Sequence, residues 1–256
     1  MDLGLASRVV LVTGGTDGLG LAAAERLLAE GAHVAVCGRD ERRRAQAQAR
    51  LGAEALVVGA DVTRVDDLRR FADAAVERWG RIDGLLNNAG SGAAGPFEAA
   101  GDELWQADYE QKVLGAVRLI RIALPHLRAA GGGAIVNVLN TGAKAPRAGS
   151  LPTTASRAAG LAIAKALSKE LGPDGIRVNA ILVGLAETDQ WQRLADRLGV
   201  TIAEVHARLL STNDVPLGRL AERTEFADLA AYLLSDRASY VSGSAVNLDG
   251  GMSPVG

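Results

Sequence analysis

Short apolar segments alternate with longer periodic segments along the whole chain, and this alternation most restricts the possible folds. Seven short runs are predicted to be strands, since they are bounded by Gly or Asp and show little two-residue alternation. They are residues 8–12, 33–37, 55–59, 84–88, 134–138, 177–182 and 244–248. Helical patterns cover residues 18–30, 41–51, 65–79, 102–130, 153–171 and 222–234. This order predicts an α/β fold of the Rossmann type, a doubly wound parallel sheet with helices on both faces.

No repeat, low-complexity tract or Pro/Gly-rich linker divides the chain, whose 256 residues suit one large α/β domain. We therefore predict a single domain over residues 1–256. Its least regular stretch, 184–218, follows the carboxyl end of a predicted strand. Because ligands in this architecture bind outside the carboxyl ends of the strands, we expect 184–218 to form a substrate lid.

The composition excludes several classes of partner. The net charge is −2 and the aromatic content is 4%, so neither nucleic acid nor a membrane surface is an expected partner. The single cysteine, Cys37, cannot form an internal disulfide and fits a reducing compartment. With no signal-peptide pattern and no membrane-spanning apolar run, the sequence favours a cytoplasmic protein that acts on a small molecule. The three histidines are scattered along the chain, so no metal site is expected.

Glycine-rich and polar motifs follow the ends of three predicted strands. TGGTDGLG, at 13–20, opens the first helix, where a tight turn lets a pyrophosphate approach the helix N-terminus. Such a turn also joins strands to helices without binding anything, so the motif alone leaves both interpretations open. Asp61 and Val62 end the third strand, however, and NNAG at 87–90 ends the fourth. Because all three lie at one edge of a parallel sheet, together they favour a dinucleotide site.

These motifs resemble those of the short-chain dehydrogenase/reductase family, and the resemblance extends along the whole chain. It includes GAIVNV at 133–138, GIRVNAI at 175–181 and LDGG at 248–251. The resemblance implies that the glycine-rich turn lines a pyrophosphate, while the ends of the third and fourth strands meet the adenine and the neighbouring ribose. The residues implied are Gly14, Thr16, Asp17, Gly18, Leu19 and Gly20 for the pyrophosphate, Asp61 and Val62 for the adenine, and Asn88, Ala89 and Gly90 for the ribose.

A further loop resembles the one that contacts the nicotinamide amide in this family. It is NAILVGLAET, at 179–188, in which a valine replaces the family's proline. The contacts implied by the resemblance come from Val183, Gly184, Ala186 and Thr188.

The end of the second predicted strand bears on which dinucleotide is bound. NAD sites carry an acidic residue there that binds the ribose 2′-hydroxyl, whereas this chain has Gly38 and Arg39. Gly38 leaves room, and Arg39 can pair with a 2′-phosphate. Against this, Asp17 places a negative charge where NADP-preferring relatives often carry Arg or Lys. We predict NADP as the cofactor, with NAD as the alternative.

The family's reaction depends on a tyrosine, a lysine four residues later, a serine thirteen residues earlier and an asparagine on the preceding helix. By resemblance, these catalytic positions fall on Thr153, Arg157, Asn140 and Lys112, so all four have changed. Thr141 supplies the serine-like hydroxyl if the loop is displaced by one residue. A similarly altered set occurs in a subgroup of β-ketoacyl-reductase-like proteins, which this chain resembles.

The replacements differ in acidity from the residues of the family. A phenol has a pKa near 10 that a cation lowers, whereas a threonine hydroxyl is a far weaker acid, so Thr153 is a poor general acid. Burial or a neighbouring Arg157 lowers the pKa of a lysine, which makes Lys112 the candidate acid. Asn140 can donate a hydrogen bond to a substrate oxygen, and Arg157 can bind the nicotinamide ribose.

No tyrosine lies between 110 and 231, so no shift of the alignment restores the missing phenol. Tyr109 lies three residues before Lys112 and is expected on the same helix face. It is therefore an alternative phenol, with a surface or interface position as its other interpretation.

Three functions remain open from the sequence. The first is an NADP-dependent oxidoreductase of the family's type, acting on a carbonyl, alcohol or imine with a nonstandard proton donor. The second is a non-redox isomerase, cyclase or dehydratase that uses the same crevice, and the third is a cofactor-binding homologue without catalysis. The predicted helices 102–130 and 153–171 resemble the family's helix–helix interface, which implies a homodimer or a homotetramer.

Overall fold

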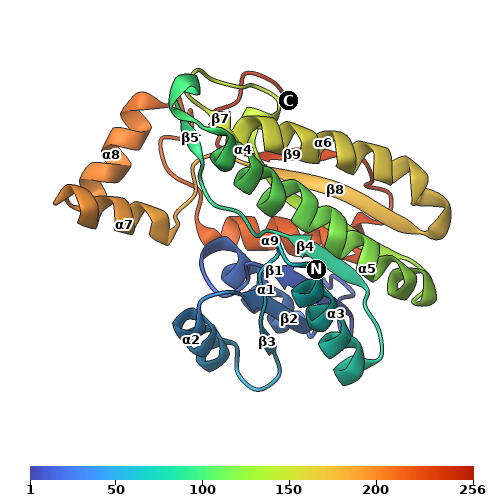
Figure 1. Cartoon of the computed structure of the whole chain (residues 1–256). Coiled ribbons are helices and arrows are strands. Elements are labelled where there is room, and N and C mark those ends of the chain that lie inside the picture. Colours follow the sequence, from blue (N-terminus) through green and yellow to red (C-terminus); the bar gives the residue numbers. More distant parts are fainter.

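The computed structural model describes all 256 residues and contains a seven-stranded parallel sheet in the order β3-β2-β1-β4-β6-β8-β9 (Figure 1). The strands are β1 (Val9–Thr13), β2 (His33–Gly38), β3 (Leu56–Gly59), β4 (Gly84–Asn87), β6 (Gly133–Asn140), β8 (Ile176–Val183) and β9 (Ala245–Leu248). The chain runs outward from β1 to β3 and then returns to β4 on the other side of β1. This reversal creates a crevice at the carboxyl ends of β1 and β4. The predicted doubly wound α/β fold is confirmed.

Helices cover both faces of the sheet. One face carries α1 (Gly18–Ala29), α2 (Glu41–Leu51) and α9 (Arg223–Leu234). The other carries α3 (Val65–Trp79), α5 (Gly115–Ala129) and α6 (Thr153–Glu170). Leu27 and Phe226 belong to the core of the first face, and Phe71 and Leu119 to the core of the second. Two buried faces explain why the strands are apolar without alternation.

The segment predicted as one helix over 102–130 is interrupted. It consists of α4 (Asp102–Tyr109), a π-helical turn (Glu110–Leu114) and α5. The N–H of Gly115 donates to the carbonyl of Glu110, five residues earlier, which is the hydrogen bond of a π-helix. An apolar pattern cannot reveal such a turn, because both flanking helices continue along the same direction.

The carboxyl edge of the sheet is extended by two small substructures. Residues 184–218 contain α7 (Asp189–Leu198) and α8 (Ile202–Thr212), which project from the body of the molecule (Figure 1). Two-residue strands β5 (Ala94–Gly95) and β7 (Leu151–Pro152) form an antiparallel pair that no sequence pattern indicated. Four 3₁₀ turns lie at Phe97–Ala99, Thr141–Ala143, Gly172–Asp174 and Asp236–Ala238. None of the helices combines the length and the apolar character that crossing a membrane requires.

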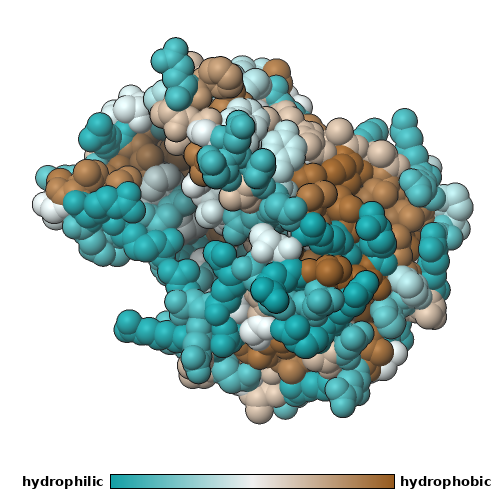
Figure 2. Space-filling model, viewed as in Figure 1, coloured by the Kyte–Doolittle hydropathy of each residue, from teal (hydrophilic) through white to brown (hydrophobic).

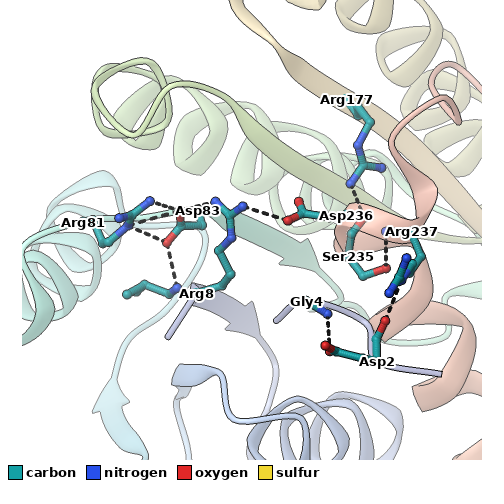
Figure 3. A network of polar contacts seen from close by, with 10 residues as sticks. Asp2, Gly4, Arg8, Arg81, Asp83, Arg177, Ser235, Asp236 and Arg237 are labelled. Carbon is teal, nitrogen blue, oxygen red and sulfur yellow. Dashed lines mark hydrogen bonds and ion pairs between the residues drawn. The ribbon is translucent and has the colours of Figure 1, made fainter. Parts of the chain in front are cut away.

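A polar network closes the opposite, amino edge of the sheet (Figure 3). The buried carboxylate of Asp83 accepts a hydrogen bond from the backbone N–H of Val9 at 2.9 Å. Arg81 donates to both of its oxygens, and Arg8 donates to it at 3.2 Å while also reaching Asp236. Burial raises the pKa of Asp83, but these donors outweigh burial and hold that pKa below its usual range.

We expect Asp83→Asn to lower the free energy of unfolding by about 1–3 kcal/mol at neutral pH, because charge-assisted hydrogen bonds are lost from a buried group. Asp236→Asn, at the exposed end of the network, is the control and should cost less than about 1 kcal/mol. Since the folded-state pKa of Asp83 is depressed, its contribution is present above the unfolded-state pKa, near 3.9, and disappears as the pH falls through the folded-state value. Urea unfolding from neutral to acid pH should therefore show the free energies of unfolding of the wild type and Asp83→Asn converging. A difference between them that stays constant with pH would contradict this account.

Candidate functional site

The turn after β1 is shaped by glycines that admit no larger residue. Gly14 has a φ of +63°, in the left-handed region. A Cβ on Gly20 would lie 2.4 Å from both the carbonyl oxygen of Gly14 and Nδ2 of Asn88. The carboxylate of Asp17 caps α1 by accepting from the N–H of Gly18 at 2.7 Å. The turn therefore brings backbone N–H groups and a helix N-terminus to the open edge, where they suit an anion.

The end of β4 is attached directly to this turn. The side-chain amide of Asn88 donates to the carbonyls of Thr13 and Gly14 at 3.0 and 3.1 Å. The hydroxyl of Thr13 accepts from the backbone N–H groups of Asn88 and Ala89, both at 3.0 Å. The structure thus brings together the two motifs predicted at 13–20 and 87–90 to bind a dinucleotide.

The ends of β2 and β3 form the outer part of the same edge. Arg39 is two-thirds exposed and lies 3.5 Å from Asp61, which joins two residues that the sequence assigned to different parts of a dinucleotide. Gly38 leaves room for Thr16, whose hydroxyl would lie 2.4 Å from a Cβ at that position. At the end of the second strand, the room beside Gly38 is therefore occupied by Thr16, and the charge of Arg39 lies next to that of Asp61.

The four positions implied to be catalytic lie on the β6–α6 side of the crevice, and Lys112 is the most enclosed of them. Lys112 lies in the π-helical turn, and its side chain is 1% exposed. Its ammonium donates to the carboxylate of Asp108 and to the hydroxyl of Thr153. Burial, with the nearby positive charge of Arg157, lowers the pKa of Lys112, and Asp108 opposes this effect.

Asp108 and Ser156 complete this cluster, and sequence reasoning missed both. The hydroxyl of Ser156 donates to the second oxygen of Asp108 at 2.5 Å, and both residues are buried. The signal that could have found Asp108 is its position four residues before Lys112, the spacing of a helical ion pair. Ser156 gave no such signal, because it comes from another helix and only the packing of α4 on α6 brings it there.

Tyr109 is not part of the cluster. Its ring stacks on that of Trp105, with 6.4 Å between the ring centroids, and it forms no hydrogen bond with Lys112. The side chain four residues before Lys112, that of Asp108, makes the contact instead, so the role of Tyr109 as an alternative phenol stays a prediction.

Arg157 and Asn140 border the same region with unused hydrogen-bonding capacity. The guanidinium of Arg157 donates to the carbonyl of Val138, while its Nε is buried without a partner. Burial lowers the pKa of Arg157 to about 10, so it stays cationic at neutral pH. The side-chain oxygens of Asn140 and Thr188 are also buried and unpartnered. Buried polar groups rarely remain unpaired, so these atoms suit a bound polar group.

The hydroxyls at the start of α6 are distinct in their contacts. No side chain caps this helix, and its N-cap residue is Pro152. Thr154 donates to the carbonyl of Ser150 at 2.8 Å, whereas the hydroxyl of Thr153 accepts from Lys112. Thr153 therefore retains a hydrogen that it can donate to another group.

The segment 184–218, predicted to be a lid, meets the glycine-rich turn through charged groups. Asp17 lies 3.5 Å from Arg43 on α2 and 3.8 Å from Arg193 on α7. Asp189, the first residue of α7, pairs with Arg223 at the start of α9. These residues line an open cavity of about 340 Å³ beside the turn. Asp17 thus has two arginines beside it, while burial and the neighbouring carboxylate of Asp189 raise its pKa.

Known proteins match this chain along nearly its whole length. A family model described as enoyl-(acyl carrier protein) reductase matches residues 14–253. A Streptomyces violaceoruber protein described as ketoacyl reductase 1 of the granaticin polyketide synthase is 37% identical over 260 residues. That alignment covers 96% of this chain and 93% of the relative.

Two solved structures show the same architecture. L-sorbose reductase from Gluconobacter frateurii, complexed with NADPH and L-sorbose, has a TM-score of 0.93 and 33% identity, with complete coverage of both chains. An NADPH-bound short chain oxidoreductase from Pseudomonas aeruginosa PAO1, described as containing an atypical catalytic center, has a TM-score of 0.92 and 35% identity over 99% of each chain.

We expect Lys112→Met to lower the free energy of unfolding by about 3–5 kcal/mol, because it leaves the charge of Asp108 buried without its cation. Adding Asp108→Asn removes that charge and should restore most of the loss. Urea unfolding measures both, with Lys165→Met on the exposed surface of α6 as the control, expected to cost less than about 1 kcal/mol. A single Lys112 variant as stable as the wild type would contradict a buried ion pair.

Proposed function

The chain belongs to the short-chain dehydrogenase/reductase family, and from this premise we propose that it is an NADP-dependent oxidoreductase with a nonstandard proton donor. Its substrate is the carbonyl group of a small molecule, reduced to an alcohol. The observation that carries this proposal is the buried hydrogen bond from Lys112 to Thr153, at the position where the family has its tyrosine. The ketoacyl and sugar reductases among its relatives support the choice of a ketone.

NADP fits the residues at the carboxyl edge. The N-terminus of α1, with the glycines that precede it, would hold the pyrophosphate, and Arg39 would pair with the 2′-phosphate. Arg157 would bind the nicotinamide ribose, and the unpartnered hydroxyl of Thr188 would meet the nicotinamide amide. The remaining proposed contacts are Gly14, Thr16, Asp17, Gly18, Leu19, Gly20, Asp61, Val62, Asn88, Ala89, Gly90, Val183, Gly184 and Ala186.

The nicotinamide ring supplies a hydride when the reduced cofactor is bound, so the chain has to supply only a proton. Thr153 donates its hydroxyl hydrogen to the substrate oxygen as that oxygen becomes negative. The ammonium of Lys112 replaces the hydrogen on Thr153 through the existing hydrogen bond. Since Thr153 never loses its proton alone, the high pKa of its hydroxyl does not prevent the transfer. Asn140 orients the substrate oxygen with its side-chain amide.

The charge of the cluster favours a carbonyl over an iminium. Asp108 carries one negative charge, and Lys112 and Arg157 carry one positive charge each, which leaves a net charge of +1 in a poorly solvated region. A positive site stabilises the oxyanion that develops during carbonyl reduction and repels a substrate that is already a cation.

We also propose that the chain forms a homodimer or homotetramer through α5 and α6. Figure 2 shows a broad apolar area over these helices, which are adjacent in Figure 1. The partly buried apolar side chains on α5 and α6 include Ile122, Leu124, Leu161 and Leu167. Large exposed apolar patches of this kind are typical of interfaces between subunits.

Thr153→Val tests the proton path, because it removes the hydroxyl and leaves the shape nearly unchanged. We expect the turnover number for ketone-dependent NADPH oxidation to fall by about 10²- to 10⁴-fold, with NADPH affinity unchanged. Thr154→Val is the matched control, since Thr154 bonds only to Ser150 and should retain near-normal turnover. Substrate conversion without NADPH oxidation would instead indicate a non-redox enzyme. NADPH binding without turnover of any carbonyl compound would indicate a homologue without catalysis.

Arg39→Gln tests the choice of dinucleotide. Losing a charge-assisted contact with the 2′-phosphate, worth about 1.5–3 kcal/mol, should weaken NADPH binding by roughly 10- to 100-fold and leave NADH binding unchanged. Arg42→Gln, three residues along and exposed, should change neither affinity. Fluorescence titration with both dinucleotides measures this, and equal losses for NADPH and NADH would contradict the assignment of Arg39.

A further inference from the structure

Asp108 holds two groups at once, one on each carboxylate oxygen. Oδ1 accepts from the ammonium of Lys112, and Oδ2 accepts from the hydroxyl of Ser156 at 2.5 Å. The Asp108 side chain is 1% exposed, so water does not take either place. With both oxygens occupied, the carboxylate has a fixed orientation, and this orientation sets where the Lys112 ammonium lies.

The same contacts direct Lys112 toward one acceptor. Its ammonium has three hydrogens, and two of them are used by Asp108 and Thr153, which lie on α4 and α6. The single hydroxyl hydrogen of Ser156 is shared between Oδ2 of Asp108, at 2.5 Å, and the carbonyl oxygen of Thr153, at 2.9 Å. One serine therefore links the Asp108 carboxylate to the first turn of the helix that carries the accepting hydroxyl.

A positive charge also faces this group. This charge belongs to Arg157 on α6, and it disfavours a second positive charge in the same region. Glu110, in the π-helical turn beside Lys112, turns away and pairs with Arg118 at 2.6 Å. Asp108 is thus the single carboxylate bonded to Lys112, and the cation depends on it.

We propose that Asp108, fixed by Ser156, is a positioning residue that keeps Lys112 protonated and directs its proton to Thr153. This inference rests on the proposed function, in which Lys112 is the proton donor. It adds a requirement that the family's neutral amide at this position does not have: a cation here needs an anion four residues earlier. The lysine and the aspartate therefore form one functional unit.

The four lysines of the chain allow a direct test on the full-length protein. Lysine labelled with ¹³C at Cε gives four resonances, and the resonance absent from Lys112→Met/Asp108→Asn identifies Lys112. We expect Asp108→Asn to lower the pH midpoint of the Lys112 titration by at least one pH unit, because the amide keeps the hydrogen bond and removes the charge. Glu110→Gln, in the same turn, should leave the midpoint unchanged.

Ser156→Ala gives a second test with the opposite sign, and it remains available if Asp108→Asn does not fold. The carboxylate loses a donor, attracts the ammonium more strongly and should raise the Lys112 midpoint by about half a pH unit. A midpoint that does not move in Asp108→Asn, or that falls in Ser156→Ala, overturns the proposal.

Turnover separates this inference from the proposed function. In the wild type, turnover should fall at high pH as Lys112 loses its proton, and in Asp108→Asn this fall should begin at lower pH. If the resonance of Lys112 moves as expected and the alkaline limb of turnover does not, Asp108 still controls the charge of Lys112, but Lys112 is not the proton donor. If both move together, both proposals are supported.

Discussion

The crevice depends on the ion pair between Lys112 and Asp108, two charged groups held almost entirely away from water. A lone ammonium at this depth would cost several kcal/mol of desolvation, and a lone carboxylate would cost a similar amount. Each makes the other possible, and Ser156 and Thr153 occupy the hydrogen-bonding positions that remain. Because α4 supplies one member and α6 the other acceptor, the pair also fixes how these helices meet above the sheet. The position of the Lys112 ammonium and the packing of α4 against α6 therefore depend on each other.

Because of the π-helical turn, one short segment contacts both the residues after β3 and the start of α6. At the end of the turn, Gly115 packs against the segment that follows β3. A Cβ on Gly115 would lie 3.1 Å from the carbonyl oxygen of Val62. Lys112, within the turn, reaches the start of α6 instead. A wider turn between two α-helices changes the direction in which successive side chains point. It thus allows close packing on the Val62 side and places the ammonium near Thr153 on the other.

Most of the fold could be predicted because its signals are local. Buried parallel strands are continuously apolar, and glycines mark the turn at 13–20. The order of the elements then predicted which edge of the sheet carries the crevice. The interruption of 102–130 was missed because the π-helical turn shifts the apolar pattern by one residue, and so small a shift does not end the helical periodicity. Ser156 was missed because its role depends on Asp108, 48 residues away in sequence. Helical spacing allowed both Tyr109 and Asp108 near Lys112, and only the packing shows that Asp108 makes the hydrogen bond.

On the proposed mechanism, this site divides between two residues what a single tyrosine does in the family. A phenol combines an oxygen at the right place with a pKa that a cation can lower. Threonine offers the oxygen without the acidity, and lysine offers the acidity from a position behind it. The direct hydrogen bond between Lys112 and Thr153 joins the two functions. An aspartate is then required where a neutral site needs none, because an ammonium, unlike a phenol, must keep its charge in a buried place in order to act as the acid.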